Sequence, residues 1–189
     1  MNISELRKKV EIPYESDKEL EHNIKLLLGL YRKVNFRVED RIKDLELVTF
    51  ESGRKHLEDL VISILEIDTT INFEKLEDQL ISINESLFLL QIMDKALDRL
   101  KNYPENGETY GKIIELRFFV KEIYNHDYIM NKVSMSRTSY YRHLPRAIQF
   151  YGVMLFGYAL PEVRTLIYDE NKDINDLKVA EKEESYYLE

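Results

Sequence analysis

Apolar residues recur at helical spacing along most of the chain, and this pattern predicts an all-α protein. One apolar face continues over residues 20–45, which corresponds to about seven turns. Ser16 is the expected N-cap of this helix, and acidic residues follow it in the first turn, where the helix dipole favours negative charge. Further helices are predicted over about 55–67 and 73–101. The wide apolar stripe of the 73–101 helix favours packing within a bundle, with a dimer seam as the alternative.

A second group of helices follows a loop at 103–107, where proline, asparagine and glycine provide the turn. The spacing predicts helices over about 108–124 and 127–133, and a longer one that begins after Ser136. A short helix is expected from Pro161, because proline suits the first helical turn.

The 127–133 segment and the helix after it have the pattern of a helix-turn-helix. Ser136 is a good N-cap for the second helix, whose apolar side is formed by Tyr140, Leu144, Ala147, Ile148, Tyr151 and Leu155. A recognition helix needs such an apolar back and a first turn of polar and basic side chains that reaches the bases. The candidate DNA contacts are Lys132, Ser136, Arg137, Thr138, Ser139, Tyr141, Arg142 and Arg146.

Each candidate has an expected role. Arg137, near the helix start, is a candidate for guanine or phosphate, whereas Arg142 and Arg146 suit phosphate or the groove wall. The short hydroxyl side chains can reach bases or phosphates. Tyr141 is expected to be exposed and to pack against a sugar or a thymine methyl group, and Lys132 to contact the DNA backbone. The alternative is that these cations are ordinary solvated side chains.

The sequence SRTSYYR at 136–142, the following Arg146-Ala147-Ile148 and the apolar run at 153–157 resemble a known family. They look like the C-terminal helix-turn-helix of the ArpU and RinA-type phage transcriptional regulators, which are related to region 4 of sigma factors. The segment YPENGETY at 103–110 resembles the lead-in of that family, so the resemblance covers roughly residues 95–157. Pro145 departs from the pattern, since the family carries a basic residue there, and proline predicts a kink.

The resemblance implies a sequence-specific regulator of phage or prophage origin that activates late genes together with host RNA polymerase. It therefore implies double-stranded DNA and RNA polymerase as partners, in the cytoplasm of a bacterial cell. Two alternatives remain open: a small terminase subunit for DNA packaging, and a helical protein-interaction module without DNA binding.

The net charge of −8 hides a basic segment. Residues 128–168 carry five Lys/Arg and one acid, a net charge of +4, whereas residues 1–127 carry −7 and residues 169–189 carry −5. A local basic patch is the electrostatic footprint of a DNA-binding protein. Phosphate contacts supply much of the affinity, so this small patch predicts weak binding by a monomer and favours a homodimer or help from a partner.

We expect three regions: a helical dimerisation or partner-binding region at 1–101, a DNA-binding domain at 102–168 and an acidic tail at 169–189. The four histidines lack metal-binding spacing, and the chain has no cysteine and no phosphate-loop or dinucleotide motif. These observations predict no enzymatic activity, cofactor or metal. No apolar run approaches the ~20 residues that span a bilayer, so we expect a cytoplasmic protein without a membrane partner.

Overall fold

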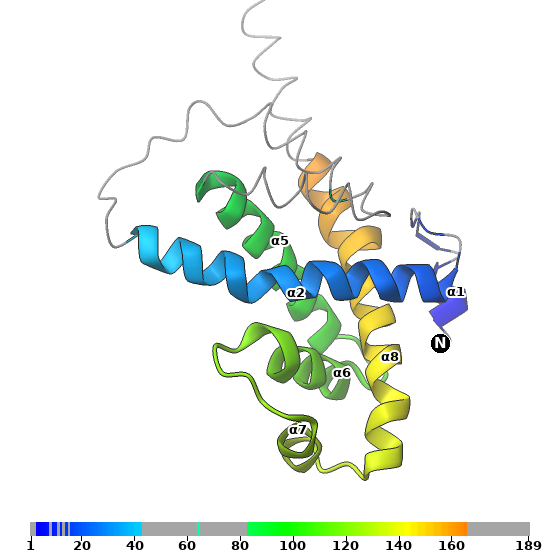
Figure 1. The fold of residues 1–189 in the computed structure, drawn as a ribbon. Helices are drawn as coiled ribbons and strands as arrows, with labels where there is room; N and C mark the ends of the chain where they lie inside the picture. Colours follow the sequence, from blue (N-terminus) through cyan, green and yellow to red (C-terminus); the bar gives the residue numbers. More distant parts are fainter. Residues whose placement is uncertain are drawn as a thin grey trace, which may run out of the picture.

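Every regular element in the described part of the chain is a helix, which confirms the predicted all-α class (Figure 1). The computed structural model describes residues 3–7, 9–10, 12, 14, 16–42, 64 and 83–165. The predicted 55–67 helix lies outside these residues except for Ile64, which is helical and buried. The beginning of the predicted 73–101 helix and the acidic tail also lie outside them.

The long helix α2 (Asp17–Ile42) begins where its cap residue predicts. The Ser16 hydroxyl accepts a hydrogen bond from the Glu19 backbone N–H at 3.1 Å, and the Glu19 carboxylate accepts one from the Ser16 N–H at 3.5 Å. This reciprocal pair satisfies two backbone donors that the first turn leaves without helical partners. The short helix α1 (Ile3–Arg7) precedes α2 and lies against α8.

Helix α5 (Ile83–Lys101) is followed by α6 (Gly107–Ile114), which widens into a π-helical segment, η2 (Glu115–Phe119). The chain becomes extended at Val120, so the predicted continuation of this helix to Tyr124 is wrong. The apolar spacing was misleading because Ile123 is 81% exposed and belongs to no core. The side chain of Arg32 on α2 binds the carbonyl groups where the helix ends, and this replaces further helical hydrogen bonds.

Helices α7 (His126–Lys132) and α8 (Arg137–Met154) agree with the predicted helix-turn-helix to within one residue. Helix α8 continues through Pro145, so the proline does not end this helix. The chain then stays helical through the π-helical segment η3 (Leu155–Ala159) to residue 165. The separate helix predicted from Pro161 is therefore wrong: the wide turn of η3 changes the hydrogen-bond register before the proline, so its missing N–H does not break the helix.

The helices share one core, with α2 lying across α5 and α8 and with α6 packed on α5 and α8 (Figure 1). Within this core the Tyr151 hydroxyl donates a 3.0 Å hydrogen bond to the Met93 carbonyl. Tyr31 on α2 donates a 2.7 Å bond to the Asp94 carboxylate on α5. The packing thus crosses the predicted boundary between residues 101 and 102. The division of the chain by function stays a prediction.

The crossing of α2 and α8 depends on Gly152, and this generates a stability prediction. A Cβ atom at Gly152 would lie 2.8 Å from Ile24 Cγ1 and 2.9 Å from Leu20 Cδ1, which is closer than packed carbon atoms approach. We expect Gly152→Ala to lower the free energy of unfolding by about 1–3 kcal/mol, because the side chains of Leu20 and Ile24 must leave their packed positions or the two helices must move apart.

The matched control is Gly29→Ala on the exposed side of α2, where an added Cβ meets nothing within 4 Å. Alanine has the higher helix propensity, so this variant should raise the free energy of unfolding by about 0.5–1 kcal/mol. Urea denaturation followed by circular dichroism measures both. Equal stability of the two variants would contradict a tight crossing at Gly152.

Candidate nucleic-acid interface

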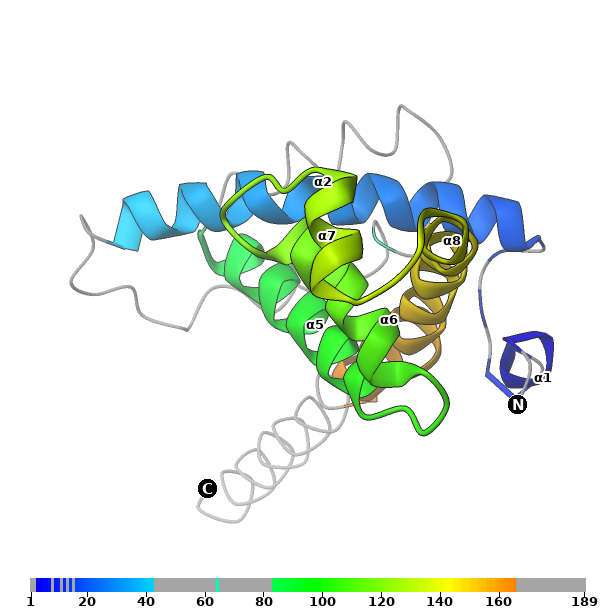
Figure 2. The same cartoon turned by 90° about the horizontal axis from the view of Figure 1, so that it is seen from below.

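Helices α7 and α8 form a helix-turn-helix at one end of the molecule, with α6 packed against α8 as its support (Figures 1 and 2). Ile129 and Met130 of α7 are buried, and Val133 is half-buried, as their inward positions predict. Tyr140 of α8 is fully buried beneath the turn. The first turns of α8 are therefore held from behind by apolar contacts, and their other side faces solvent.

The turn between the two helices has a defined hydrogen-bonding pattern. Met135 N–H donates to the Met130 carbonyl at 3.0 Å, and Ser134 N–H donates to the Asn131 carbonyl at 3.2 Å. These are the two bonds of a Schellman motif, and Ser134 occupies its left-handed position with a φ of 55°. Ser136 then caps α8, because its hydroxyl accepts from the Ser139 N–H at 3.3 Å. The predicted N-cap is confirmed.

The predicted contact residues lie together on α7 and on the exposed side of α8. All are exposed except Ser139, which is half-buried. Because residues four apart share a helix face, the exposed side chains form two rows, Arg137–Tyr141 and Thr138–Arg142–Arg146. None of the four cations Lys132, Arg137, Arg142 and Arg146 forms an ion pair with a described residue. Their charges are therefore available to an anionic ligand.

Aromatic rings are interleaved with these cations. The guanidinium carbon of Arg137 lies 5.9 Å from the centre of the Tyr141 ring, and the ring of His126 lies 5.4 Å from that of Tyr141. On α7, the Lys132 ammonium group lies 5.4 Å from the centre of the Tyr128 ring. Such cation–π contacts restrict the directions in which the cations and rings point.

Tyr124, His126 and Tyr128 belong to this surface although the sequence analysis did not single them out. The rings of Tyr124 and Tyr128 are stacked, with centres 4.2 Å apart. The sequence could have indicated the contact of Tyr128 with Lys132, because residues four apart on a helix are neighbours. It could not have indicated that Tyr124 lies beside Tyr128, because the apolar spacing placed Tyr124 at the end of the preceding helix.

The loop before α7 is held by two arginines. Arg32 donates hydrogen bonds of 2.7 Å to the carbonyls of Val120 and Arg117 and one of 3.3 Å to that of Glu122. Arg117 donates to the Tyr124 carbonyl at 3.4 Å. Burial lowers the pKa of Arg32, and the nearby charge of Arg117 adds to this effect. The long helix α2 therefore fixes where the chain enters α7.

His126 joins the two helices of the motif. Its Nδ1 atom lies 2.9 Å from the hydroxyl oxygen of Tyr140, and the two rings meet edge to face. Partial burial lowers the pKa of His126, and the charge of Arg117 lowers it further, whereas Asp127 opposes the shift. The neutral imidazole is therefore the form that the folded protein favours.

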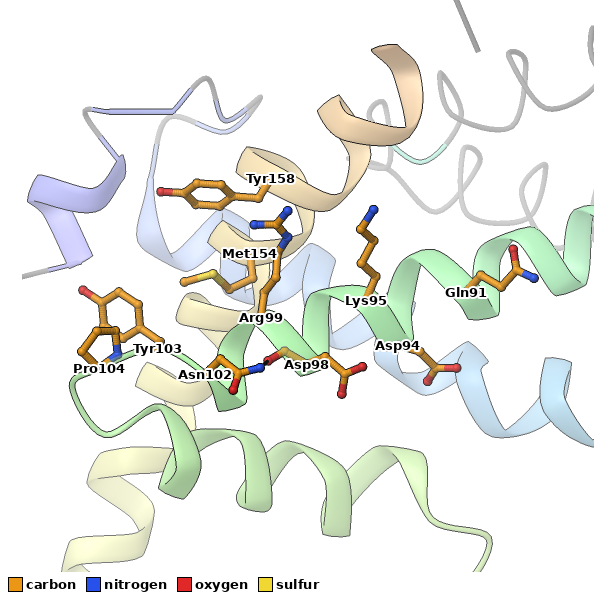
Figure 3. Close-up of a pocket in the computed structure, with 10 residues that line it drawn as sticks. All are labelled: Gln91, Asp94, Lys95, Asp98, Arg99, Asn102, Tyr103, Pro104, Met154 and Tyr158. Carbon is orange, nitrogen blue, oxygen red and sulfur yellow. Dashed lines mark hydrogen bonds between the residues drawn. The ribbon is translucent and has the colours of Figure 1, made fainter. Parts of the chain in front are cut away.

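A groove of about 740 Å³ lies away from the helix-turn-helix, between α5 and the C-terminal part of α8 with η3 (Figure 3). Lys95 and Arg99 of α5 line it, and both form ion pairs with Glu162. Arg99 also lies over the Tyr158 ring, 5.7 Å from its centre. Because the protein pairs both cations itself, this groove offers less free positive charge than the helix-turn-helix.

No protein-family model matches the chain, and neither a curated protein nor a solved structure is similar to it. Among the residues that the structure describes, no three His, Asp or Glu side chains are grouped so as to hold a metal ion. The helices in this part of the chain are all too short or too polar to cross a membrane.

The Arg32 contacts generate a prediction about both stability and local order. We expect Arg32→Ala to lower the free energy of unfolding by about 1–3 kcal/mol, because partly buried carbonyl groups lose a charged donor. Hydrogen exchange should accelerate in residues 120–132 more than in α5. The control is Arg37→Ala, an exposed arginine on the same helix with no ion pair to a described residue. Similar exchange in the two variants would contradict the role of Arg32.

The lowered pKa of His126 predicts a pH dependence of stability. The folded protein binds the proton less readily than the unfolded chain, so stability is fully present above the unfolded pKa and falls as the pH decreases below about 6.5. Replacing this histidine with glutamine should reduce the slope of the unfolding free energy between about pH 5 and 6.5. His22→Gln on the exposed side of α2 is the control. An unchanged slope in His126→Gln would refute the assignment.

Proposed function

We propose that the protein is a sequence-specific DNA-binding transcriptional regulator and that α8 is its recognition helix. The observation that carries the proposal is the row of exposed cations and hydroxyl groups on the first turns of α8, none of the cations being paired within the described residues. Unpaired cations on a convex helix are suited to the negatively charged major groove.

The support for this helix fits the same function. The Schellman turn, the Ser136 cap and the buried Tyr140 fix α8 relative to α7. Base readout needs side chains that arrive at fixed positions, whereas phosphate attraction alone needs only charge. In this proposal Arg137, Thr138 and Tyr141 face the bases, and Arg142, Arg146 and Lys132 bind phosphates.

The biological setting of the proposal rests on the resemblance of SRTSYYR to the phage regulators. On that basis the protein acts at a late promoter with host RNA polymerase. Four cations on the face give a monomer limited affinity, which favours a homodimer on the DNA.

The exposed apolar residues favour a protein partner in addition to DNA. Phe36 on α2 is 65% exposed, and Ile123 in the loop bound by Arg32 is 81% exposed. Aromatic side chains such as that of Phe36 are enriched at protein interfaces. We propose that they contribute to binding a partner, either RNA polymerase or a second copy.

The first experiment is a binding titration of the full chain against fragments of the neighbouring genome at low and moderate salt. One fragment that stays bound in added salt and competitor DNA would support sequence-specific readout. Uniform binding that disappears with salt would support non-specific attraction instead. The absence of binding would refute the proposal.

We expect Arg137→Ala combined with Arg142→Ala to weaken binding to that fragment by at least about tenfold and to reduce the salt dependence by about one to two phosphate contacts. Both side chains are exposed, so the melting temperature should stay close to that of the unmodified chain. The matched control is Lys18→Ala combined with Arg37→Ala, which removes two exposed cations from α2. Equal losses in the two double variants would show that only overall charge matters.

A further inference from the structure

The recognition face, defined by Lys132, Arg137, Arg142 and Arg146, differs from several other basic parts of the surface in having no ion pairs with described residues. Arg7 is paired with Asp17, Lys101 with Glu115, and both Lys95 and Arg99 with Glu162. Lys132, Arg137, Arg142 and Arg146 have no such ion pair in the described part of the chain. The face is therefore a concentrated positive charge at one end of a protein whose total charge is −8.

The same chain carries a segment of opposite charge. Residues 169–189 contain eight Asp/Glu and three Lys, a net charge of −5. The last seven residues, 183–189, contain three glutamates, two tyrosines and no lysine. Their combination of acids and aromatic rings complements the cations and rings of Arg137, Tyr141 and Tyr128.

The C-terminal segment is long enough to reach the recognition face of its own chain. The structure describes this helix as far as residue 165, and Arg142 lies 23 residues before that point, which is about 35 Å along the helix. An extended chain covers about 3.3 Å per residue, so about eleven residues are needed to return that distance. Residues 177–189 therefore remain to contact the face.

We infer that the acidic C-terminal segment, residues 169–189, binds the recognition face of its own chain and competes with DNA. The inference rests on the proposed function for its consequence, because it assigns a regulator to the same face. The tether gives the segment an effective concentration in the millimolar range, so weak ion pairs suffice to compete with non-specific DNA. Specific DNA, which also gains base contacts, displaces it.

The first test compares DNA affinity in two full-length proteins. In one variant all eight acidic residues of 169–189 are replaced by their amides, and in the control the same residues are kept in scrambled order. At about 50 mM salt we expect the amide variant to bind non-specific DNA at least about fivefold more tightly than the unmodified chain. The difference should shrink as salt is added, and the scrambled control should behave like the unmodified chain.

The second test detects the contact without DNA. The chain has no cysteine, so Ser185→Cys provides a single site for a spin label. We expect the label to broaden the backbone NMR signals of residues 137–146 at low salt more than those of α5, and added salt to restore them. The matched control carries the same label in the amide variant, where the broadening should be lost.

The two tests separate the inference from the proposed function. Equal DNA affinity of the amide variant and the unmodified chain, with no selective broadening, would overturn the inference and leave the proposed function intact. Selective broadening without DNA binding by either protein would support the contact and overturn the DNA-binding function. Broadening spread evenly over the molecule would overturn the inference as well.

Discussion

The placement of the candidate interface depends on the close crossing of α8 with α2 and α5. The C-terminal half of α8 is buried, and Gly152 allows it to approach Leu20 and Ile24. The Tyr151 hydroxyl bonds to the Met93 carbonyl at the same level. The N-terminal half of the same helix carries the exposed cations. Helix α8 stays continuous through Pro145, so the packing of its buried half also positions the end that carries these cations.

A second constraint determines the position of α7. Arg32 on α2 binds one carbonyl group in the last turn of η2 and two in the loop that leads into α7. Both helices of the helix-turn-helix are thus oriented by the same long helix, α8 through apolar packing and α7 through hydrogen bonds. A ligand or partner that displaced α2 would therefore change the relative position of α7 and α8. The N-terminal region of the chain is part of the interface geometry although none of its residues belongs to the candidate contacts.

Local signals in the sequence predicted the elements, and non-local contacts explain the errors. The caps Ser16 and Ser136 act on backbone groups three residues away, so their effect could be inferred from the sequence. The early end of the helix before Val120 depends on Arg32, which is distant in the chain. The stacking of Tyr124 on Tyr128 could not be predicted from the sequence either, because it requires the loop conformation that Arg32 stabilises. Continuity through Pro161 depends on a π-helical turn, for which apolar spacing gives no signal.

The candidate site shows why total charge is a poor guide to function. A net charge of −8 suggests repulsion from DNA, yet the fold pairs cations such as Lys95 and Arg99 with neighbouring acids and leaves those of α8 unpaired. Fields from charges beyond about 10 Å are largely screened at physiological salt, so the nearby unpaired groups dominate what a phosphate meets. This face carries only four such cations, so general attraction to DNA phosphates is limited. Such a protein must gain a larger share of its affinity from base contacts, which favours selective over non-specific binding.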